Sequence, residues 1–302
     1  MGSLLTRHFL GAGHDVVVLS RAPRGGATPH VAWDAKTLGP WTSELDGCDV
    51  VINLAGRSVD CRYSDANRRA IMDSRVESTR VVGRAIAAAK QPPPLWLQAS
   101  TATIYGHRFD APNDEATGIL GGSEQGANPK WPYSIEVAKA WEAAAREVPL
   151  PRTRLVILRS AMVMHSDRGS IFDVLRTLAR RGLGGTVGSG RQFVSWIHSR
   201  DFTAAIDFLI ERADLAGAVN LASPGPLPYA SFMAELRQAC GMRIGLPTPE
   251  WLLAIGAFML RTEPELVLKS RRVVPGRLLD AGFRFTYPEW RPAVRNLCER
   301  PR

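Results

Sequence analysis

The stretch SLLTRHFLGAGHDVVVLSR, residues 3–21, decides the fold of this chain. Its first part predicts a helix, and the glycines at Gly11 and Gly13 predict a turn. DVVVLS, residues 15–20, is a β-branched apolar run that is typical of a buried strand. A helix that leads directly into such a strand is the second half of a βαβ unit, so we expect a parallel sheet.

In parallel sheets that bind dinucleotides, this unit starts with a strand and a glycine-rich phosphate loop. Here Met1 and Gly2 run straight into the helix, so the first strand and most of the loop are missing from the sequence. We interpret Gly2 as the last glycine of that loop, beside a coenzyme pyrophosphate at the helix N-terminus. The missing strand would be central, so we expect a slot in the sheet, weak cofactor binding and low stability. A reading frame that starts upstream of Met1 is one explanation.

Strands and helices alternate through the first half of the chain, which predicts an α/β fold with helices on both faces of a parallel sheet. We expect a Rossmann-type, doubly wound domain over residues 1–165, truncated at its N-terminus, which also receives a strand near 218–223. Residues 166–302 are expected to form a smaller, mostly helical lobe that binds substrate. The other predicted strands cover residues 30–34, 48–56, 94–100 and 154–160, and the other predicted helices cover 64–90, 134–146, 171–181 and a segment ending near 212.

Composition excludes several classes of protein. The net charge is +9, from 38 Lys+Arg against 29 Asp+Glu, but the basic residues are scattered, which argues against nucleic-acid binding. The four cysteines show no CxxC spacing, which argues against a metal site or a disulfide framework and favours the reducing cytoplasm. No apolar run approaches the roughly 20 residues needed to cross a membrane.

Polar and small residues follow the predicted strands, where ligands bind in open α/β sheets. Ser20 and Arg21 stand where an acidic residue would hold the ribose of NAD, and an arginine there suits the 2′-phosphate of NADP instead. NLAG, residues 53–56, offers small residues where backbone approaches a nucleotide closely. STATIYG, residues 100–106, places hydroxyls after the next strand, and Tyr133 stands at a predicted helix start.

These motifs, with GSGRQFVSWIH (residues 188–198) and AVNLASP (residues 218–224), resemble the extended short-chain dehydrogenase/reductase superfamily. Within it, the chain looks like the atypical proteins labelled NAD-dependent epimerase/dehydratase or cell-division-inhibitor-like sugar-nucleotide epimerase. LKSRRVVPGRLLDAGFRFTYP, residues 268–288, is similar to the C-terminal module of that group. The resemblance covers nearly the whole chain.

The resemblance implies that Thr101 is the catalytic Ser/Thr and that Tyr133 is the catalytic general acid/base. Together with the strand-end pattern, it implies a cofactor site, with NADP preferred over NAD and no metal, at Gly2, Ser20, Arg21, Asn53, Leu54, Ala55, Gly56, Ser100 and Arg159. Asp114 and Glu115 resemble an acidic turn that shapes the loop before the catalytic helix.

The chain departs from the superfamily pattern after Tyr133. The expected lysine four residues on is Val137, and Lys139 lies roughly 240° around the helix from Tyr133. A tyrosine with an ordinary pKa near 10 is a poor base without a nearby cation. Two interpretations stay open: Tyr133 donates a proton or hydrogen bond in catalysis, or it only packs at a helix start.

Other motifs allow more than one interpretation. Arg75 is a candidate for binding phosphate or carboxylate, or for a structural ion pair. His198 has the neighbours of a core residue rather than a base, and the glycines of residues 182–190 favour a flexible lip over a substrate cleft.

Two functions follow from these observations. The first is an NADP-dependent oxidoreductase or epimerase that acts on a small polar or nucleotide-linked substrate by hydride transfer. The second is a non-catalytic NADP-binding sensor or scaffold, which Val137 favours; an inactive product of a mis-assigned start is the third possibility. A homodimer is compatible with the sequence.

Overall fold

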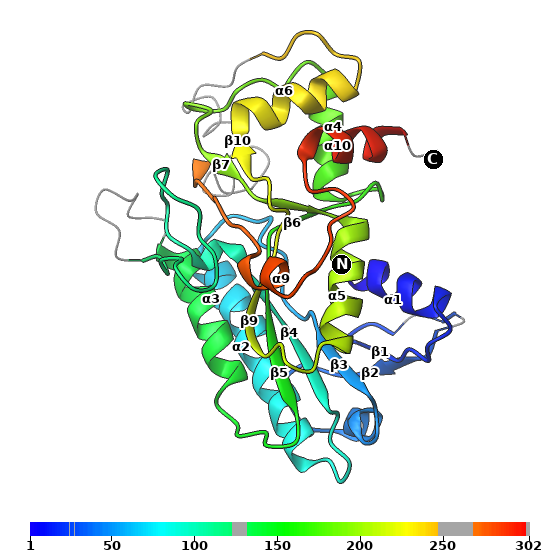
Figure 1. The fold of residues 1–302 in the computed structure, drawn as a ribbon. Coiled ribbons are helices and arrows are strands. Elements are labelled where there is room, and N and C mark those ends of the chain that lie inside the picture. Colours follow the sequence, from blue (N-terminus) through cyan, green and yellow to red (C-terminus); the bar gives the residue numbers. More distant parts are fainter. Residues whose placement is uncertain (24, 27, 123–131, 247–267, 300–302) are drawn as a thin grey trace.

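The computed structural model describes residues 1–302 except 24, 27, 123–131, 247–267 and 300–302. Its centre is a four-stranded parallel sheet in the order β3-β4-β5-β9 (Figure 1). The strands are β3 (Val50–Asn53), β4 (Leu95–Thr101), β5 (Arg154–Ser160) and β9 (Gly217–Leu221). Side chains of β4 are buried nearly throughout, as the continuous apolar run predicts for a central parallel strand.

Helices cover both faces of this sheet, so the expected doubly wound α/β fold is confirmed. On one face, α2 (Asp65–Ala88) and α3 (Pro132–Ala145) bury apolar side chains around Trp96 of β4. On the other face, α1 (Gly2–Gly11) and α5 (Ser199–Glu211) pack on β4 and β5. The single buried side chain of α1 is Leu5.

The slot expected in the sheet is present. β1 (Val18–Ser20) pairs in parallel with β2 (His30–Ala32), and within the described residues β3 has β4 as its sole strand partner. The two sheets are therefore not joined by a backbone ladder between β1 and β3. Residues 50–52 of β3 are only partly buried, as befits an edge strand. The helix α1 is held instead by α5, where His8 Nε2 lies 2.7 Å from an oxygen of Asp207.

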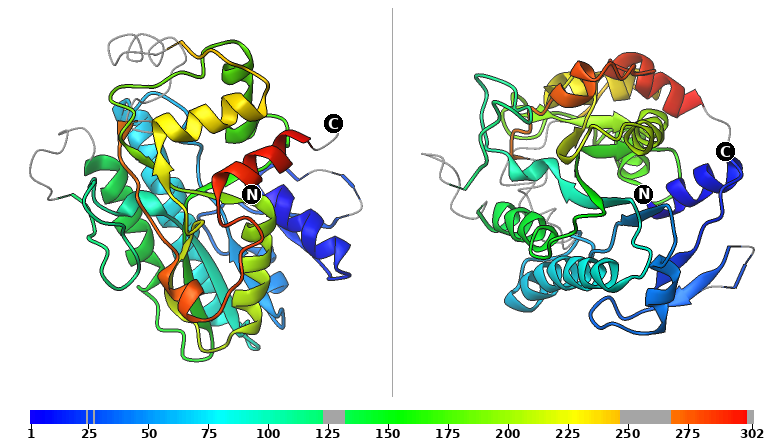
Figure 2. Two further views of the ribbon diagram at one scale, coloured as in Figure 1. Left: turned by 45° about the horizontal axis from the view of Figure 1, so that its top comes forward. Right: turned by 60° about the horizontal axis from the view of Figure 1, so that its bottom comes forward.

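A smaller lobe lies beyond the carboxyl ends of the sheet (Figures 1 and 2). The sequence analysis missed most of its elements because they are short or carry no clear period. The lobe contains β6 (Met162–Met164) paired with β8 (Trp196–His198), β7 (Phe193–Val194) paired with β10 (Leu227–Pro228), and the helices α4 (Ile171–Arg180), α6 (Tyr229–Ala239) and α10 (Trp290–Glu299). Its core gathers around Trp196 and Trp290, whose rings are 4.9 Å apart.

The chain crosses between the two parts several times. After the first lobe elements it returns to the sheet with α5 and β9, and α9 (Gly276–Asp280) then packs near β9. Residues 247–267, which belong to the mostly helical lobe expected over 166–302, lie outside the described residues. Among the residues that are described, no helix has the length and apolarity to cross a bilayer.

We predict that the amides on the open side of β3 exchange with solvent hydrogen faster than those of β4. In a parallel pair, alternate N–H groups of β3 point away from β4 and have no ladder partner on the side of β1. Hydrogen exchange followed by NMR should show a difference on the order of 100-fold. Strand β4, which has a neighbour on each side, is the internal control. Uniform protection across β3 and β4 would contradict an open edge.

Candidate functional site

The expected nucleotide end of the site consists of the amino end of α1 and the carboxyl end of β1. A Cβ built on Gly2 meets no atom within 4 Å, and the first turn of α1 contains no acidic side chain. Arg21 is exposed just after β1, and the Ser20 hydroxyl accepts a hydrogen bond from Ala22 N at 3.2 Å. Open backbone, unpaired helix N–H groups and an exposed arginine fit the pyrophosphate and 2′-phosphate of NADP.

The NLAG turn after β3 is shaped by Asn53. Its buried side chain accepts a hydrogen bond from Ala55 N at 3.0 Å and donates to Gln98 Oε1 at 2.9 Å. This fixes the backbone of Leu54 and Ala55, both half-buried, beside β4. A Cβ at Gly56 would lie 3.3 Å from Cζ of Arg75, so a larger residue there would require the Arg75 side chain to shift slightly.

Arg75 has a structural role, though not in an ion pair. Its Nη1 donates to the carbonyls of Arg57 at 3.0 Å and Ile71 at 3.1 Å, and its guanidinium lies 5.0 Å from the ring centre of Trp141. Burial lowers the pKa of this guanidinium from its ordinary value. Arg75 thus ties the turn after β3 to the neighbouring helices.

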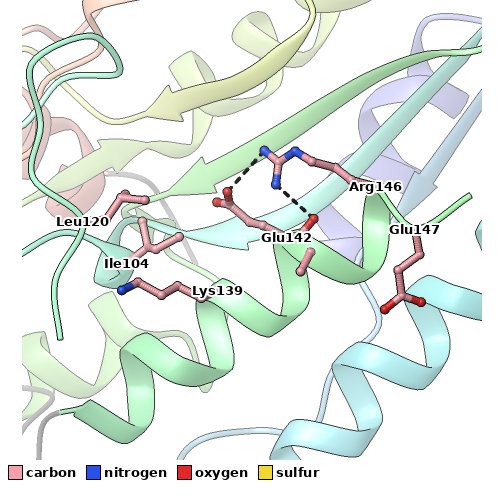
Figure 3. Close-up of a pocket in the computed structure, with 7 residues that line it drawn as sticks. Ile104, Leu120, Lys139, Glu142, Arg146 and Glu147 are labelled. Carbon is pink, nitrogen blue, oxygen red and sulfur yellow. Dashed lines mark hydrogen bonds and ion pairs between the residues drawn. The ribbon is translucent and has the colours of Figure 1, made fainter. Parts of the chain in front are cut away.

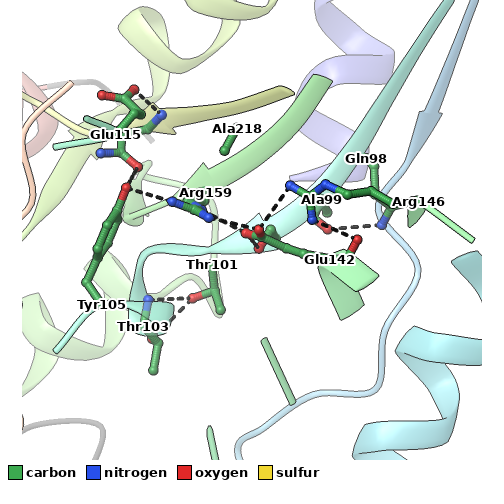
Figure 4. Close-up of polar contacts among 12 residues, drawn as sticks. Gln98, Ala99, Thr101, Thr103, Tyr105, Glu115, Glu142, Arg146, Arg159 and Ala218 are labelled. Atoms are coloured by element: carbon green, nitrogen blue, oxygen red, sulfur yellow. Dashed lines mark hydrogen bonds and ion pairs between the residues drawn. The ribbon is translucent and has the colours of Figure 1, made fainter. Parts of the chain in front are cut away.

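A buried ion pair lies where β4, β5 and α3 meet (Figure 4). Arg159 Nε and Nη2 donate to the two oxygens of Glu142 at 2.8 and 2.9 Å. Ser100 Oγ donates to the same carboxylate at 2.8 Å. The side chains of Arg159 and Glu142 are only 9% and 5% exposed, so the pair is shielded from solvent. This is the bidentate geometry in which an arginine–carboxylate pair is strongest.

The ion pair continues into a chain of hydrogen bonds. Arg159 Nη1 donates to Tyr105 Oη at 2.9 Å, and Tyr105 Oη donates to Asn220 Oδ1 at 3.0 Å. Asn220 N in turn donates to Glu115 Oε1 at 2.7 Å, and Arg277 N donates to Glu115 Oε2 at 3.2 Å. The acidic turn therefore does more than shape its own loop, because it joins β9 to α9.

These contacts set the electrostatics of the pair. Burial disfavours the Glu142 carboxylate, but the hydrogen bonds and charge of Arg159 outweigh burial and hold its pKa below the ordinary value. Burial likewise opposes the charge on Arg159, and Glu142 reverses this and raises the pKa of the guanidinium. Because Arg159 and Ser100 are engaged by Glu142, their contact with a cofactor stays a prediction.

The expected substrate end of the site begins at Thr101, the last residue of β4. Its Oγ1 donates to Thr103 Oγ1 at 3.1 Å and accepts from Thr103 N at 3.2 Å. Residues 268–273 of the C-terminal module reach the same place. Lys269 Nζ donates to Thr103 O at 3.1 Å, and Arg271 Nε donates to Thr103 Oγ1 at 3.3 Å. The sequence analysis missed both cations. The basic cluster KSRR, residues 269–272, is the sequence feature that could have indicated them.

Tyr133 is engaged in the structure. Its hydroxyl donates to the carbonyl of Arg68 at 2.6 Å, and its ring meets that of Tyr63 edge to face at 5.2 Å. Burial raises the pKa of Tyr133 to about 12, despite the opposing charges of Arg75 and Arg68. Tyr133 is therefore a neutral phenol at physiological pH.

The helix that carries Tyr133 offers it no cation. Val137 is buried, whereas Lys139 is exposed and lines a separate pocket of ≈ 460 Å³ on another side of α3 (Figure 3). The pocket is lined by Ile104, Leu120, Lys139, Glu142, Ala143, Arg146 and Glu147. It adjoins the outer side of the buried ion pair rather than the turns after β1 and β3.

His198 is a buried capping residue. Its Nδ1 accepts a hydrogen bond from Arg200 N at 3.0 Å at the start of α5, and its ring stacks 4.1 Å from that of Tyr287. Its full burial fits the expectation that it is a core residue. Among the residues the structure describes, no group of three or more His, Cys, Asp or Glu side chains is arranged to hold a metal ion.

The family model for the NAD dependent epimerase/dehydratase family matches residues 1–222, and the domain of unknown function DUF1731 matches residues 248–297. The chain belongs to this epimerase/dehydratase family. It is 32% identical over 302 residues to the epimerase family protein SDR39U1 of Bos taurus, covering 98% of this chain and 96% of that protein. It is 31% identical over 303 residues to the epimerase family protein YfhF of Bacillus subtilis, covering 98% and 94%.

Solved structures of the family are similar as well. The human epimerase family protein SDR39U1 (isoform 2), crystallised with NADPH, matches with a TM-score of 0.85 at 29% identity, over 99% of this chain and 95% of that chain. The nucleoside-diphosphate sugar epimerase from Corynebacterium glutamicum matches with a TM-score of 0.75 at 26% identity, over 98% of this chain and 55% of that chain. The fold and family implied by the sequence motifs are confirmed.

We predict that Glu142→Gln lowers the free energy of unfolding by about 3–5 kcal/mol, because it leaves the buried Arg159 charge without its partner. Glu147→Gln, just beyond the end of the same helix, is the matched control, since Glu147 pairs with Arg80 at an exposed site. This control substitution should lower the free energy of unfolding by less than about 1 kcal/mol. Urea denaturation at neutral pH measures both variants, and equal losses would contradict the role given to the buried pair.

The difference between wild type and Glu142→Gln should depend on pH. The pKa of Glu142 is lowered in the folded state from its ordinary value of 4.5. Its stabilisation is therefore complete above pH 4.5 and is lost as the pH falls through the lower, folded-state pKa. Denaturation curves at a series of pH values should converge in acid. A constant difference down to the lowest pH at which both proteins fold would contradict this assignment.

Proposed function

We propose that this protein is an NADP-dependent oxidoreductase or epimerase that acts on a small polar or nucleotide-linked substrate by hydride transfer. The observation that carries the proposal is Arg21, exposed at the end of β1, where the dinucleotide fold places the adenosine ribose. The NADPH in the similar human structure supports the same cofactor. The similarity to a nucleoside-diphosphate sugar epimerase supports a nucleotide-linked substrate.

The residues of the nucleotide end would hold the cofactor as follows. The first N–H groups of α1, beside Gly2, face the pyrophosphate, and Arg21 pairs with the 2′-phosphate while Ser20 shapes the turn between them. The turn of residues 53–56 lies along the ribose and adenine, with Asn53 fixing its backbone. When bound, the nicotinamide supplies or accepts the hydride.

At the substrate end, Thr101 orients the reacting oxygen. Thr103 N donates to Thr101 Oγ1, and the Thr101 hydroxyl donates to Thr103 Oγ1, so the hydroxyl must turn away from Thr103 Oγ1 to donate to a substrate carbonyl or hydroxyl. Tyr133, a neutral phenol, is suited to donate a proton rather than to take one. For this role, its hydrogen bond to Arg68 O must give way to the substrate.

A non-catalytic NADP-binding sensor or scaffold is the second candidate. The hydrogen bond of Tyr133 to Arg68 O and the buried Val137 in place of a lysine favour it. In both functions the ligand is a small molecule. Four free cysteines are compatible with a reducing compartment, so we place the protein in the cytoplasm.

We predict that Arg21→Asp weakens NADPH binding at least about tenfold and leaves NADH binding within about twofold, because the 2′-phosphate loses its charged partner. Fluorescence titration of the reduced coenzymes measures both affinities. Arg84→Asp makes the same charge change at an exposed site on α2 and should leave the preference unchanged. If Arg21→Asp still preferred NADPH over NADH to the same extent, the argument that the cofactor is NADP would be removed.

We predict that Thr101→Val lowers kcat by about 100-fold with any substrate found in a panel of nucleotide sugars, because the reacting oxygen loses its hydrogen-bond donor. NADPH affinity should stay within about twofold, since Thr101 is placed at the substrate end.

Tyr133→Phe should lower kcat by about 10–100-fold if Tyr133 donates a proton. A protein that binds NADPH but whose turnover is unaffected by both substitutions supports the scaffold instead.

A further inference from the structure

Two cysteines far apart in sequence meet in the lobe. Cys240 follows the last residue of α6, and Cys298 lies in α10; their Sγ atoms are 3.9 Å apart, and both residues are half-buried. The thiols are in van der Waals contact. The two side chains would have to rotate to form a disulfide, whose S–S bond is about 2.05 Å long.

The packing of α6 against α10 fixes this encounter. At the start of the two helices, the ring of Trp290 stacks on that of Phe232 at 4.2 Å and 15°, and Trp290 Nε1 donates to Phe232 O at 2.9 Å. Cys240 and Cys298 each stand eight residues beyond these anchors. Eight residues advance a helix by about 12 Å and turn it by about 80°, so the thiols have the same offset on both helices.

Further contacts hold the same register. Arg291 Nε lies 3.7 Å from Glu235 Oε1, which is a second link between the helices. Leu236 and Val294 are buried in the shared core midway between the aromatic anchors and the thiols. The approach of the sulfur atoms is thus a consequence of a packed interface rather than of two exposed side chains.

The two thiols are electrostatically unequal. The contact with Cys298 lowers the pKa of Cys240 against the effect of burial, and Arg180 and Arg176 of α4 lower it further. The same contact, together with burial, raises the pKa of Cys298. Ionisation of the pair is therefore favoured at Cys240 over Cys298. Nucleophilic cysteines owe their reactivity to such cationic neighbours.

We propose that Cys240 and Cys298 form a redox-active dithiol that closes to a disulfide on oxidation by hydrogen peroxide and locks α10 onto α6. In the first step the Cys240 thiolate attacks a peroxide oxygen, so that an S–O bond forms, the O–O bond breaks and the departing hydroxide takes up a proton to become water. In the second, the Cys298 sulfur attacks the sulfenic sulfur; an S–S bond forms, the S–O bond breaks and a second water leaves. Two thiols lose two electrons, and one peroxide gains them.

The remaining cysteines provide internal controls. Cys48 Sγ contacts Leu45 O at 3.5 Å and Cys61 Sγ contacts Ser58 O at 3.9 Å, each within its own loop. Burial raises the pKa of Cys48, which keeps it a thiol. Neither has the paired thiol or the two arginines of α4 that Cys240 has.

Peptide mapping of the intact, reduced protein tests the proposal. After treatment with one equivalent of hydrogen peroxide and alkylation, a non-reducing tryptic digest should contain peptide 238–243 joined to the peptide that begins at Asn296. The joined pair should form at least about tenfold faster than Cys48 or Cys61 is modified, and dithiothreitol should release it. The joined pair should be found in the monomer band of a non-reducing gel.

Two variants separate a reactive dithiol from mere proximity. Arg180→Gln should slow closure about threefold, whereas Arg181→Gln, an exposed neighbour with the same loss of charge, should not. In Cys298→Ser, Cys240 should be trapped by dimedone as the sulfenic acid. Wild-type protein in which Cys240 and Cys298 stay alkylatable at the rate of Cys48, or are joined to other chains instead, would overturn the proposal.

Discussion

The structure depends on the buried ion pair between Glu142 and Arg159. Each charge would carry a large desolvation cost alone, and the bidentate geometry with the added hydrogen bond of Ser100 offsets it. The partners come from α3 and β5, and Ser100 comes from β4, so the interaction fixes one helix against the two central strands. Thr101 is the next residue after Ser100, and its position follows from the same contact.

The hydrogen-bond chain that leaves Arg159 extends this constraint to the rest of the site. Through Tyr105 and Asn220 it reaches β9, and Asn220 Nδ2 donates to Val274 O at 2.9 Å. A buried network of this kind restricts the arrangement of its members, because an unpaired group inside it is costly. The C-terminal module is therefore held against the sheet by polar contacts at the carboxyl ends of the strands.

Sequence alone predicted the sheet well, because β-branched runs such as residues 50–53 and 154–160 carry a strong local signal. It also predicted which strand ends would carry polar groups. It did not predict the partners of those groups. Arg159 near the end of a strand suggests a ligand contact, and only the fold reveals Glu142 beside it. The pairing of Tyr105 with Asn220, 115 residues apart, leaves no periodic pattern in the sequence.

The slot beside β3 was predictable from topology, whereas the anchoring of α1 was not. In a closed ladder, a helix of this kind is positioned by the strands that flank it. Here Leu5 and the pairing of His8 with Asp207 hold α1 on α5, across the sheet face. The amino end of α1 is therefore positioned by a helix–helix contact, and the proposed cofactor site at Gly2 and Arg21 rests on that contact.

The C-terminal module is part of the candidate site rather than an appendage. Val273 is fully buried and forms a bridge with Asn113, and Ser195 Oγ donates to Arg271 O at 2.6 Å. These contacts bring Lys269 and Arg271 to Thr103, which orders Thr101. The residues matched by the domain of unknown function thus contribute cations beside the hydroxyl proposed to contact substrate. Positive charge next to a reacting oxygen stabilises negative charge that develops on it, so the proposed chemistry at Thr101 would draw on the module as well as on the sheet.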